Sequence, residues 1–311
     1  MDGSSHSARR RRYWLASVFA MGSLACSRPS PAPEPAHEAM PQSTPQTVPQ
    51  RVREPAVAGG FYPDDPNVLR AQVDGLISQA KARNIRGLRA LVCPHAGYQY
   101  SGPIAASGFK QLVGLKFDRV VVMAPSHHVP FAGVAIPDVD ALRTPIGLIP
   151  MSDVARKLAA ERPFLVDSVP HAKEHALEVE LPFLQRVLDR FELVPLVFGE
   201  VDEAEVARRL NEFVDARTFF VASSDLSHYY PYEKAQQLDR ATVDAIVNLD
   251  IDALVKKGQA CGKSPVLALV HLARLRGWKT LLLDYRNSGD TAGDRSRVVG
   301  YAAIAFLDSP G

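Results

Sequence analysis

The chain has 311 residues, 46% hydrophobic and 23% charged, so it can bury a core in one large domain or two small ones. Its formal net charge of +2 becomes −1 once the four arginines and one aspartate of residues 1–25 are left out. A near-neutral body without a dense lysine and arginine run argues against nucleic acid as a partner. Three cysteines are too few for a disulfide framework.

The first 26 residues have the pattern of a secretion leader. Arg9–Arg12 form a basic head, and residues 13–25 form an uncharged, mainly apolar run, shorter than the ~20 residues of a membrane span. The run ends in "GSLAC", which resembles a bacterial lipoprotein cleavage box. We therefore expect export to the bacterial cell envelope and a lipid anchor on Cys26, on the periplasmic side of a membrane. A plain secretory signal and a twin-arginine signal are the alternatives.

Residues 27–52 are rich in proline, serine, glutamine and threonine and lack apolar periodicity. Such a segment buries too little surface to offset the entropy lost on ordering it. We expect a disordered tether between the leader and a domain that spans residues 53–308. No later segment resembles a linker, so one domain is expected.

From Arg53 onward, short apolar runs alternate with segments of helical periodicity. The alternation predicts a single α/β domain with a central sheet flanked by helices, and the continuous apolar runs predict strands covered on both faces. The expected strands are residues 89–93, 119–123, 193–198, 218–222, 280–283 and 298–306. The expected helices are residues 67–82, 104–113, 151–160, 177–191, 203–214, 233–248 and 266–276.

Polar motifs follow three of the expected strands. They are "CPHAGYQYSG" at 93–102, "APSHH" at 124–128 and "SSDLSHYY" at 223–230. In an open α/β sheet, ligands bind beyond the carboxyl ends of the strands. We therefore expect the three motifs to meet in one crevice.

Four histidine and aspartate positions in these motifs are candidates for chemistry. His95 stands at a strand end and can point into the crevice, but such a histidine is also common as a hydrogen-bonded structural residue. Of His127 and the histidine after it, only one is expected to face a shared metal, because adjacent side chains point apart. Asp225 and His228 are three residues apart and could share one side of a turn, or the aspartate could cap the next segment.

Two acids precede or begin an expected helix. Glu174 and Glu178 are four residues apart and would share a face if that helix starts early. The alternative is a solvated first turn, favoured by the helix dipole.

The two cysteines of the body have different surroundings. Cys261 lies beside a glycine and before a helix start, where a lowered pKa would favour the metal-binding thiolate; the alternative is a buried apolar cysteine. Cys93 is expected in the core, or in a disulfide with Cys261 in an oxidising envelope. Histidine, cysteine and carboxylate together at loop positions indicate a metal site.

Six motifs, in this order, resemble the Memo family, whose bacterial and archaeal members are often called AmmeMemoRadiSam system protein B. They are "REPAVAGGFYP", "PHAGYQYSG", "APSHH", "EHALEVELPFL", "SSDLSHYY" and "CGKSP", and they cover residues 53–306. The resemblance implies a fold similar to class III extradiol dioxygenases. It also implies iron (Fe2+) or copper on His95, His127 and Cys261. His228 would line the same pocket, with Asp225 and Glu178 as supporting groups.

Two histidines and one thiolate leave open positions on iron or copper, which favours a redox-active non-heme metal protein. Whether it is an oxidoreductase or a metal carrier stays open, and its small-molecule or peptide ligand is unknown. A thiolate in place of the dioxygenase carboxylate argues against carrying over catechol ring cleavage. The alternatives are a metal-independent module that binds a peptide or small anion, and a metal-dependent hydrolase with His228 as base.

Overall fold

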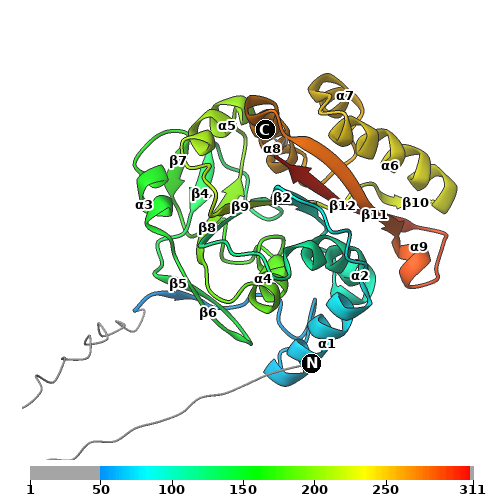
Figure 1. Ribbon diagram of the computed structural model, residues 1–311, viewed down its shortest axis with the longest axis horizontal. Coiled ribbons are helices and arrows are strands. Elements are labelled where there is room, and N and C mark those ends of the chain that lie inside the picture. The colour runs from blue at the N-terminus through cyan, green and yellow to red at the C-terminus, as the bar shows by residue number, and fades with distance from the viewer. Residues whose placement is uncertain (1–49, 309–311) are drawn as a thin grey trace, which may run out of the picture. The chain divides into compact units, whose positions relative to one another are not determined.

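The computed structural model describes residues 50–308 (Figure 1). The predicted leader and residues 27–49 of the predicted linker lie outside the described residues, as do residues 309–311. The last three linker residues are described and belong to the folded part. The backbone N–H groups of Gln50 and Arg51 donate to Asp140 Oδ2, and Val52 begins a strand.

Within the described residues, nine strands form one mixed sheet in the order β10-β12-β2-β9-β3-β8-β4-β7, with β11 paired to β12. Four neighbours at its centre are parallel: β2 (Leu88–Cys93), β9 (Thr218–Ser223), β3 (Arg119–Pro125) and β8 (Glu192–Phe198). Nearly all their side chains are buried, as the continuous apolar runs predicted. The other strands are β4 (Val134–Ile136), β7 (Phe164–Val166), β10 (His228–Tyr230), β11 (Lys279–Asn287) and β12 (Val298–Leu307).

A smaller sheet joins β1 (Val52–Arg53), β5 (Ala141–Thr144) and β6 (Gly147–Pro150). β1 runs parallel to β5, and β5 runs antiparallel to β6. This sheet therefore ties the beginning of the described chain to its middle.

Helices cover both faces of the large sheet (Figure 1). α2 (Tyr98–Phe109) packs on β2, β11 and β12, and α1 (Pro66–Gln79) and α4 (Leu181–Val187) pack on α2. On the other face, α8 (Lys263–Arg276) packs on β9 and β3. None of the described helices is both long and apolar enough to cross a membrane. The remaining helices are α3 (Asp153–Ala159), α5 (Glu203–Asn211), α6 (Tyr232–Val247), α7 (Ile251–Lys257), α9 (Ser288–Thr291) and the short 3-10 helices η1 (Lys110–Leu112) and η2 (Glu178–Glu180).

The expected helix over residues 177–191 is wrong in its extent. The chain forms η2 and then α4, which ends at Val187 because Leu188 has an extended backbone. Glu178 and Glu180 are fully buried, so this turn has no solvated face. The apolar spacing was therefore not that of an amphipathic helix, and the solvated first turn proposed for Glu174 and Glu178 is also wrong.

Candidate metal centre

The three polar motifs meet at the carboxyl ends of β2, β3 and β9, which are neighbours in the sheet. Cys261 reaches the same place from the turn before α8. Its backbone N–H donates to Asp225 O at 3.2 Å, and the N–H of Gly262 donates to Ser224 Oγ at 2.9 Å. A Cβ on Gly262 would lie 2.3 Å from Ser223 O, so only glycine lets the turn approach the end of β9 this closely.

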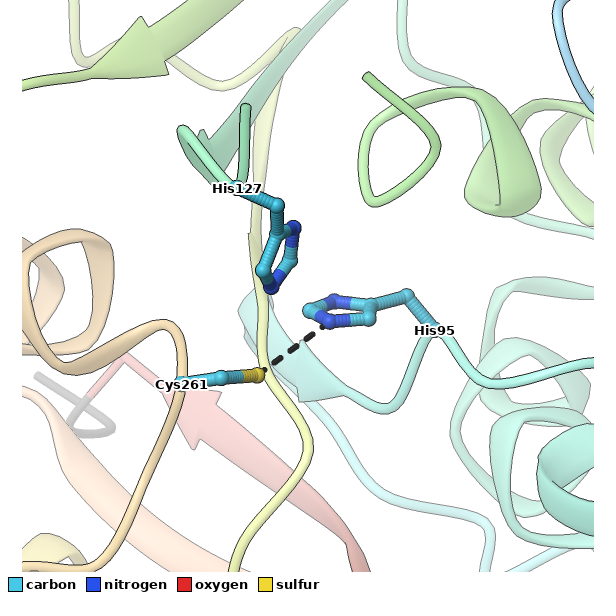
Figure 2. A group of neighbouring side chains, drawn as sticks. All are labelled: His95, His127 and Cys261. Atoms are coloured by element: carbon cyan, nitrogen blue, oxygen red, sulfur yellow. Dashed lines mark hydrogen bonds between the residues drawn. The ribbon is translucent and has the colours of Figure 1, made fainter. Parts of the chain in front are cut away.

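His95, His127 and Cys261 point toward one another (Figure 2). Cys261 Sγ lies 3.2 Å from His95 Nε2, and one ligand atom from each of the three residues lies within 4.8 Å of the others. The two imidazole rings are nearly perpendicular, with centroids 5.2 Å apart. Two imidazole nitrogens and one sulfur, converging on a single point, are a donor set for a first-row transition metal.

The ring of His95 is held from behind by Ser223. His95 Nδ1 lies 2.9 Å from Ser223 Oγ, which also lies 2.8 Å from Ala176 O and 2.6 Å from Glu180 Oε1. Burial raises the pKa of Glu180 well above its ordinary value, which favours the protonated carboxyl group. Glu180 can then donate to Ser223, Ser223 donates to Ala176 O, and His95 Nδ1–H donates to Ser223. This leaves His95 Nε2 unprotonated, and the Cys261 thiol can donate to it at 3.2 Å.

Glu174 holds His127 in the same way. His127 Nδ1 donates to Glu174 Oε1 at 2.9 Å, and the His127 backbone N–H donates to Glu174 Oε2 at 2.7 Å. The N–H groups of His175 and Ala176 also donate to Oε1. Burial opposes ionisation of Glu174, but these hydrogen bonds outweigh it and lower its pKa to about 2. His127 Nε2 is therefore the free ring nitrogen.

His175 is a site residue to which the sequence reasoning gave no role. Its ring stacks on His127 with centroids 4.6 Å apart and meets His95 edge-on at 5.3 Å. Its ligand atom also groups with those of His127 and Glu174 within 4.8 Å. Because both Glu174 oxygens already accept hydrogen bonds, we interpret this second group as support for His127. Burial lowers the pKa of His175 to about 4, so the ring is neutral at neutral pH.

Two of the three residues expected beside the metal lie there. Asp225 Oδ1 accepts from the His95 backbone N–H at 2.8 Å, and the Asp225 N–H donates to Cys261 Sγ at 3.3 Å. Burial raises the pKa of Asp225 to about 7. His228 lines the adjoining cavity, and its Nδ1 donates to Leu226 O at 2.8 Å, which leaves Nε2 unprotonated in the neutral ring.

Glu178 lies elsewhere, which corrects the expectation that it supports the centre. Its carboxylate accepts from the N–H groups of Ala56 and Val57, at 2.7 and 3.0 Å, and also binds Arg53 and the Tyr62 hydroxyl. Arg53 in turn donates to His171 O and Glu174 O. Glu178 therefore fixes the beginning of the domain against the loop that carries Glu174.

Both cysteines of the described chain are free, so the disulfide alternative is wrong in this structure. Cys93 is fully buried in the core beneath α2, as expected. The expected lowering of the Cys261 pKa is also wrong: burial and the neighbouring Asp225 raise the pKa of its thiol to about 12. A bound cation would have to displace this proton. Its positive charge would then stabilise the thiolate, which burial alone disfavours.

The donor set opens onto a cavity of about 890 Å³. This volume suits a small molecule, since ligand pockets typically hold about 300–1,000 Å³. Besides the three donors, its walls include His175, Asp225, His228 and the aromatic side chains of Phe61, Tyr100, Tyr229 and Tyr301.

Comparison with known proteins places the chain among relatives of similar length. The model of Memo-like proteins matches residues 53–305. A MEMO1 family protein of Aquifex aeolicus is 36% identical over 270 residues, which cover 83% of this chain and 100% of the relative. Those of Methanococcoides burtonii and Nitrosopumilus maritimus are 38% and 31% identical, over 81% and 82% of this chain and 99% and 100% of theirs. The protein is therefore a member of the Memo family.

Proposed function

We propose that this protein is a redox-active non-heme metal protein that holds one iron or copper ion on His95, His127 and Cys261. The observation that carries the proposal is the orientation of the two rings. Each histidine donates through Nδ1 to a buried partner, and each free nitrogen faces the same sulfur. A histidine that binds a metal typically donates its other ring N–H to such a partner, which leaves the second nitrogen for the metal.

The chain's own groups have defined tasks in this proposal. The Asp225 N–H group stabilises the Cys261 thiolate by donating to its sulfur. His228, fixed by Leu226 O, presents an unprotonated nitrogen that can accept a proton from a molecule in the cavity. Iron or copper, when bound, would supply one-electron chemistry and open coordination positions.

Metal content tests the proposal. The full-length protein, purified without chelator or metal-affinity tag, is expected to contain near-stoichiometric iron or copper by mass spectrometry. His95→Ala and Cys261→Ser are expected to lose it, while His128→Ala, next to a ligand but outside the donor set, keeps it. A folded wild-type protein that takes up neither reduced iron nor copper would contradict the proposal and favour the metal-independent binding module.

Activity measurements distinguish an oxidoreductase from a metal carrier. Turnover of a defined substrate by the loaded protein, lost in His228→Ala with metal retained, would support an oxidoreductase. Tight copper binding without turnover would support a carrier. Hydrolysis that persists with a redox-inert ion such as zinc would favour the hydrolase.

We also propose export and lipid anchoring through Cys26, which lies outside the described residues. Wild-type protein is expected to take up labelled lipid and enter the detergent phase of a Triton X-114 separation, and Cys26→Ala is expected to do neither. Equal partitioning of the two proteins would instead favour a plain secretory signal.

A further inference from the structure

The cavity beside the donor set has a second polar feature, formed by Tyr229 and Arg297. Tyr229 lies in β10, and Arg297 lies immediately before β12. The Arg297 guanidinium carbon is 5.2 Å from the centre of the Tyr229 ring, which is a cation–π distance. Both side chains line the cavity while remaining open to solvent.

The backbone of Tyr229 is strained in this position. Its φ is +63°, a left-handed conformation that residues other than glycine rarely adopt. It stands at an irregularity of the β10–β12 pairing, where the register shifts between His228 and Tyr230. The Tyr229 side chain is 62% exposed, so burial does not compensate for the strain. Strain without a gain in packing is typical of functional positions, and bulges redirect side chains beside such sites.

Arg297 is a cation whose guanidinium N–H groups are available for hydrogen bonds. No described carboxylate forms an ion pair with it. Asp294, which also lines the cavity, instead accepts from the backbone N–H and the hydroxyl group of Ser296. Arg295, two residues earlier, is engaged with Asp290 and the Tyr232 ring. Arg297 is therefore available to bind an anion that enters the cavity.

We propose that Arg297 and Tyr229 recognise the carboxylate of a small organic acid with an apolar body. One planar guanidinium matches one carboxylate in a bidentate pair. A phosphate dianion would call for more positive charge, whereas the described cavity wall combines this single arginine with Asp225 and Asp294. Phe61, Tyr100 and Tyr301 supply apolar surface for the body of the ligand. Any reaction of such a ligand rests on the proposed metal function, but binding of its carboxylate by Arg297 and Tyr229 does not.

A matched pair of probes tests this recognition. 4-Fluorobenzoate and the neutral 4-fluorobenzamide have nearly the same shape, and fluorine NMR reports the binding of both to the full-length, metal-loaded protein. We expect benzoate to bind at least tenfold more tightly than benzamide. Arg297→Gln is expected to remove that preference, and the control Arg295→Gln to keep it. Equal affinities for the two probes in wild-type protein would overturn the inference.

Tyr229→Gly separates recognition from structure. Glycine accepts the left-handed backbone, so the variant is expected to melt at the same or a higher temperature while its affinity for benzoate falls several-fold. Unchanged benzoate affinity in this variant would exclude Tyr229 from the recognition site.

Cys261→Ser distinguishes this inference from the metal proposal. Arg297-dependent benzoate binding that survives in the metal-free variant would support the anion site whatever the fate of the metal proposal. Benzoate binding that is lost with the metal and does not respond to Arg297→Gln would place the carboxylate on the metal and overturn the inference. Phenyl phosphate binding as tightly as benzoate would overturn the assignment to carboxylates.

Discussion

Ser223 has one hydroxyl proton and three polar neighbours, so its hydrogen bonds depend on the protonation of Glu180. With Glu180 protonated, Ser223 can bind His95, Ala176 O and Glu180 at once. With Glu180 ionised, one of these contacts would lack a proton. The protonation of Glu180 thus determines how Ser223 binds His95, although Glu180 forms no hydrogen bond with the histidine.

This arrangement predicts different outcomes for two substitutions. Ser223→Ala leaves His95 Nδ1–H without its partner and is expected to weaken metal binding about 10–100-fold, the usual effect of removing a partner of a ligating histidine. Glu180→Gln keeps a donor beside Ser223 and is expected to change metal affinity by less than about threefold. Competition with a chelator of known affinity measures both. Equal losses in the two variants would mean that Glu180 acts as a carboxylate.

The same residues set the limit of what the sequence could predict for the site. His95, His127 and Cys261 follow from ordered motifs, and the structure brings them together. Glu178 was expected there from the resemblance to the Memo family. The chain forms a buried 3-10 turn instead, so only Glu174 reaches His127. Hydrogen-bond partners from separate segments leave no periodic signal in a sequence.

At the scale of elements, the N-terminus of α8 sets the position of Cys261. Gly262 lies against the end of β9, and an added Cβ would also come within 2.8 Å of Ser224 Cβ. These neighbours are backbone and short side chains that cannot move aside. The N-terminus of α8 would therefore have to move away from β9, and the Cys261 thiol would move with it.

Gly262→Ala is accordingly expected to lower the free energy of unfolding by about 1–3 kcal/mol, as overpacking does, and to reduce metal content. Gly75→Ala is the matched control. Gly75 lies inside α1 with nothing within 4 Å of an added Cβ, and the change is expected to stabilise by about 0.5–1 kcal/mol. Urea denaturation and metal analysis measure the two effects. A fully metal-loaded Gly262→Ala protein would show that the turn tolerates displacement.

Element length decided which parts of the fold the sequence could predict. Each of the six expected strands is present, because a strand of six or more residues is long enough to carry a clear apolar run. The strands β1, β4, β5, β6, β7 and β10 span two to four residues and have too few positions to show a period. β10 is the most consequential of these, since it carries His228 and Tyr229.

At the scale of the whole molecule, buried neutral histidines link folding to pH. His171 is 3% exposed, its Nε2 donates to Ala135 O at 2.9 Å, and burial lowers its pKa to about 4. The unfolded chain, with a histidine pKa near 6.5, binds this proton more readily than the folded one. Its contribution to stability is therefore complete above about pH 6.5, falls as the pH drops, and levels off below about pH 4.

His171→Gln, which keeps a donor for Ala135 O, removes this titration. Between pH 6.5 and pH 4, the variant is expected to lose about 3 kcal/mol less stability than the wild-type protein. The free energies of unfolding in urea at the two pH values provide the comparison. Parallel losses in both proteins would assign the acid sensitivity to other groups, such as His175.

The sequence predicted the class of the whole molecule well because alternation of strands and helices is a global signal. A single α/β domain with a central sheet and helices on both faces is confirmed. The antiparallel pairing of β11, β12 and β2 was not expected, since strand direction depends on connections rather than on composition. The similarity of this fold to class III extradiol dioxygenases stays a prediction.

Arg53 gives the domain a mechanical property. The chain enters through β1, whose second residue, the largely buried Arg53, is joined to Glu178, His171 O and Glu174 O. Tension applied to the chain at residue 50 would therefore act on these bonds and on the pairing of β1 with β5. Through Glu174 O it would also act on the loop whose Glu174 side chain orients His127. A pull on the N-terminal end of the described chain would thus be passed to the candidate metal centre through the Arg53 side chain.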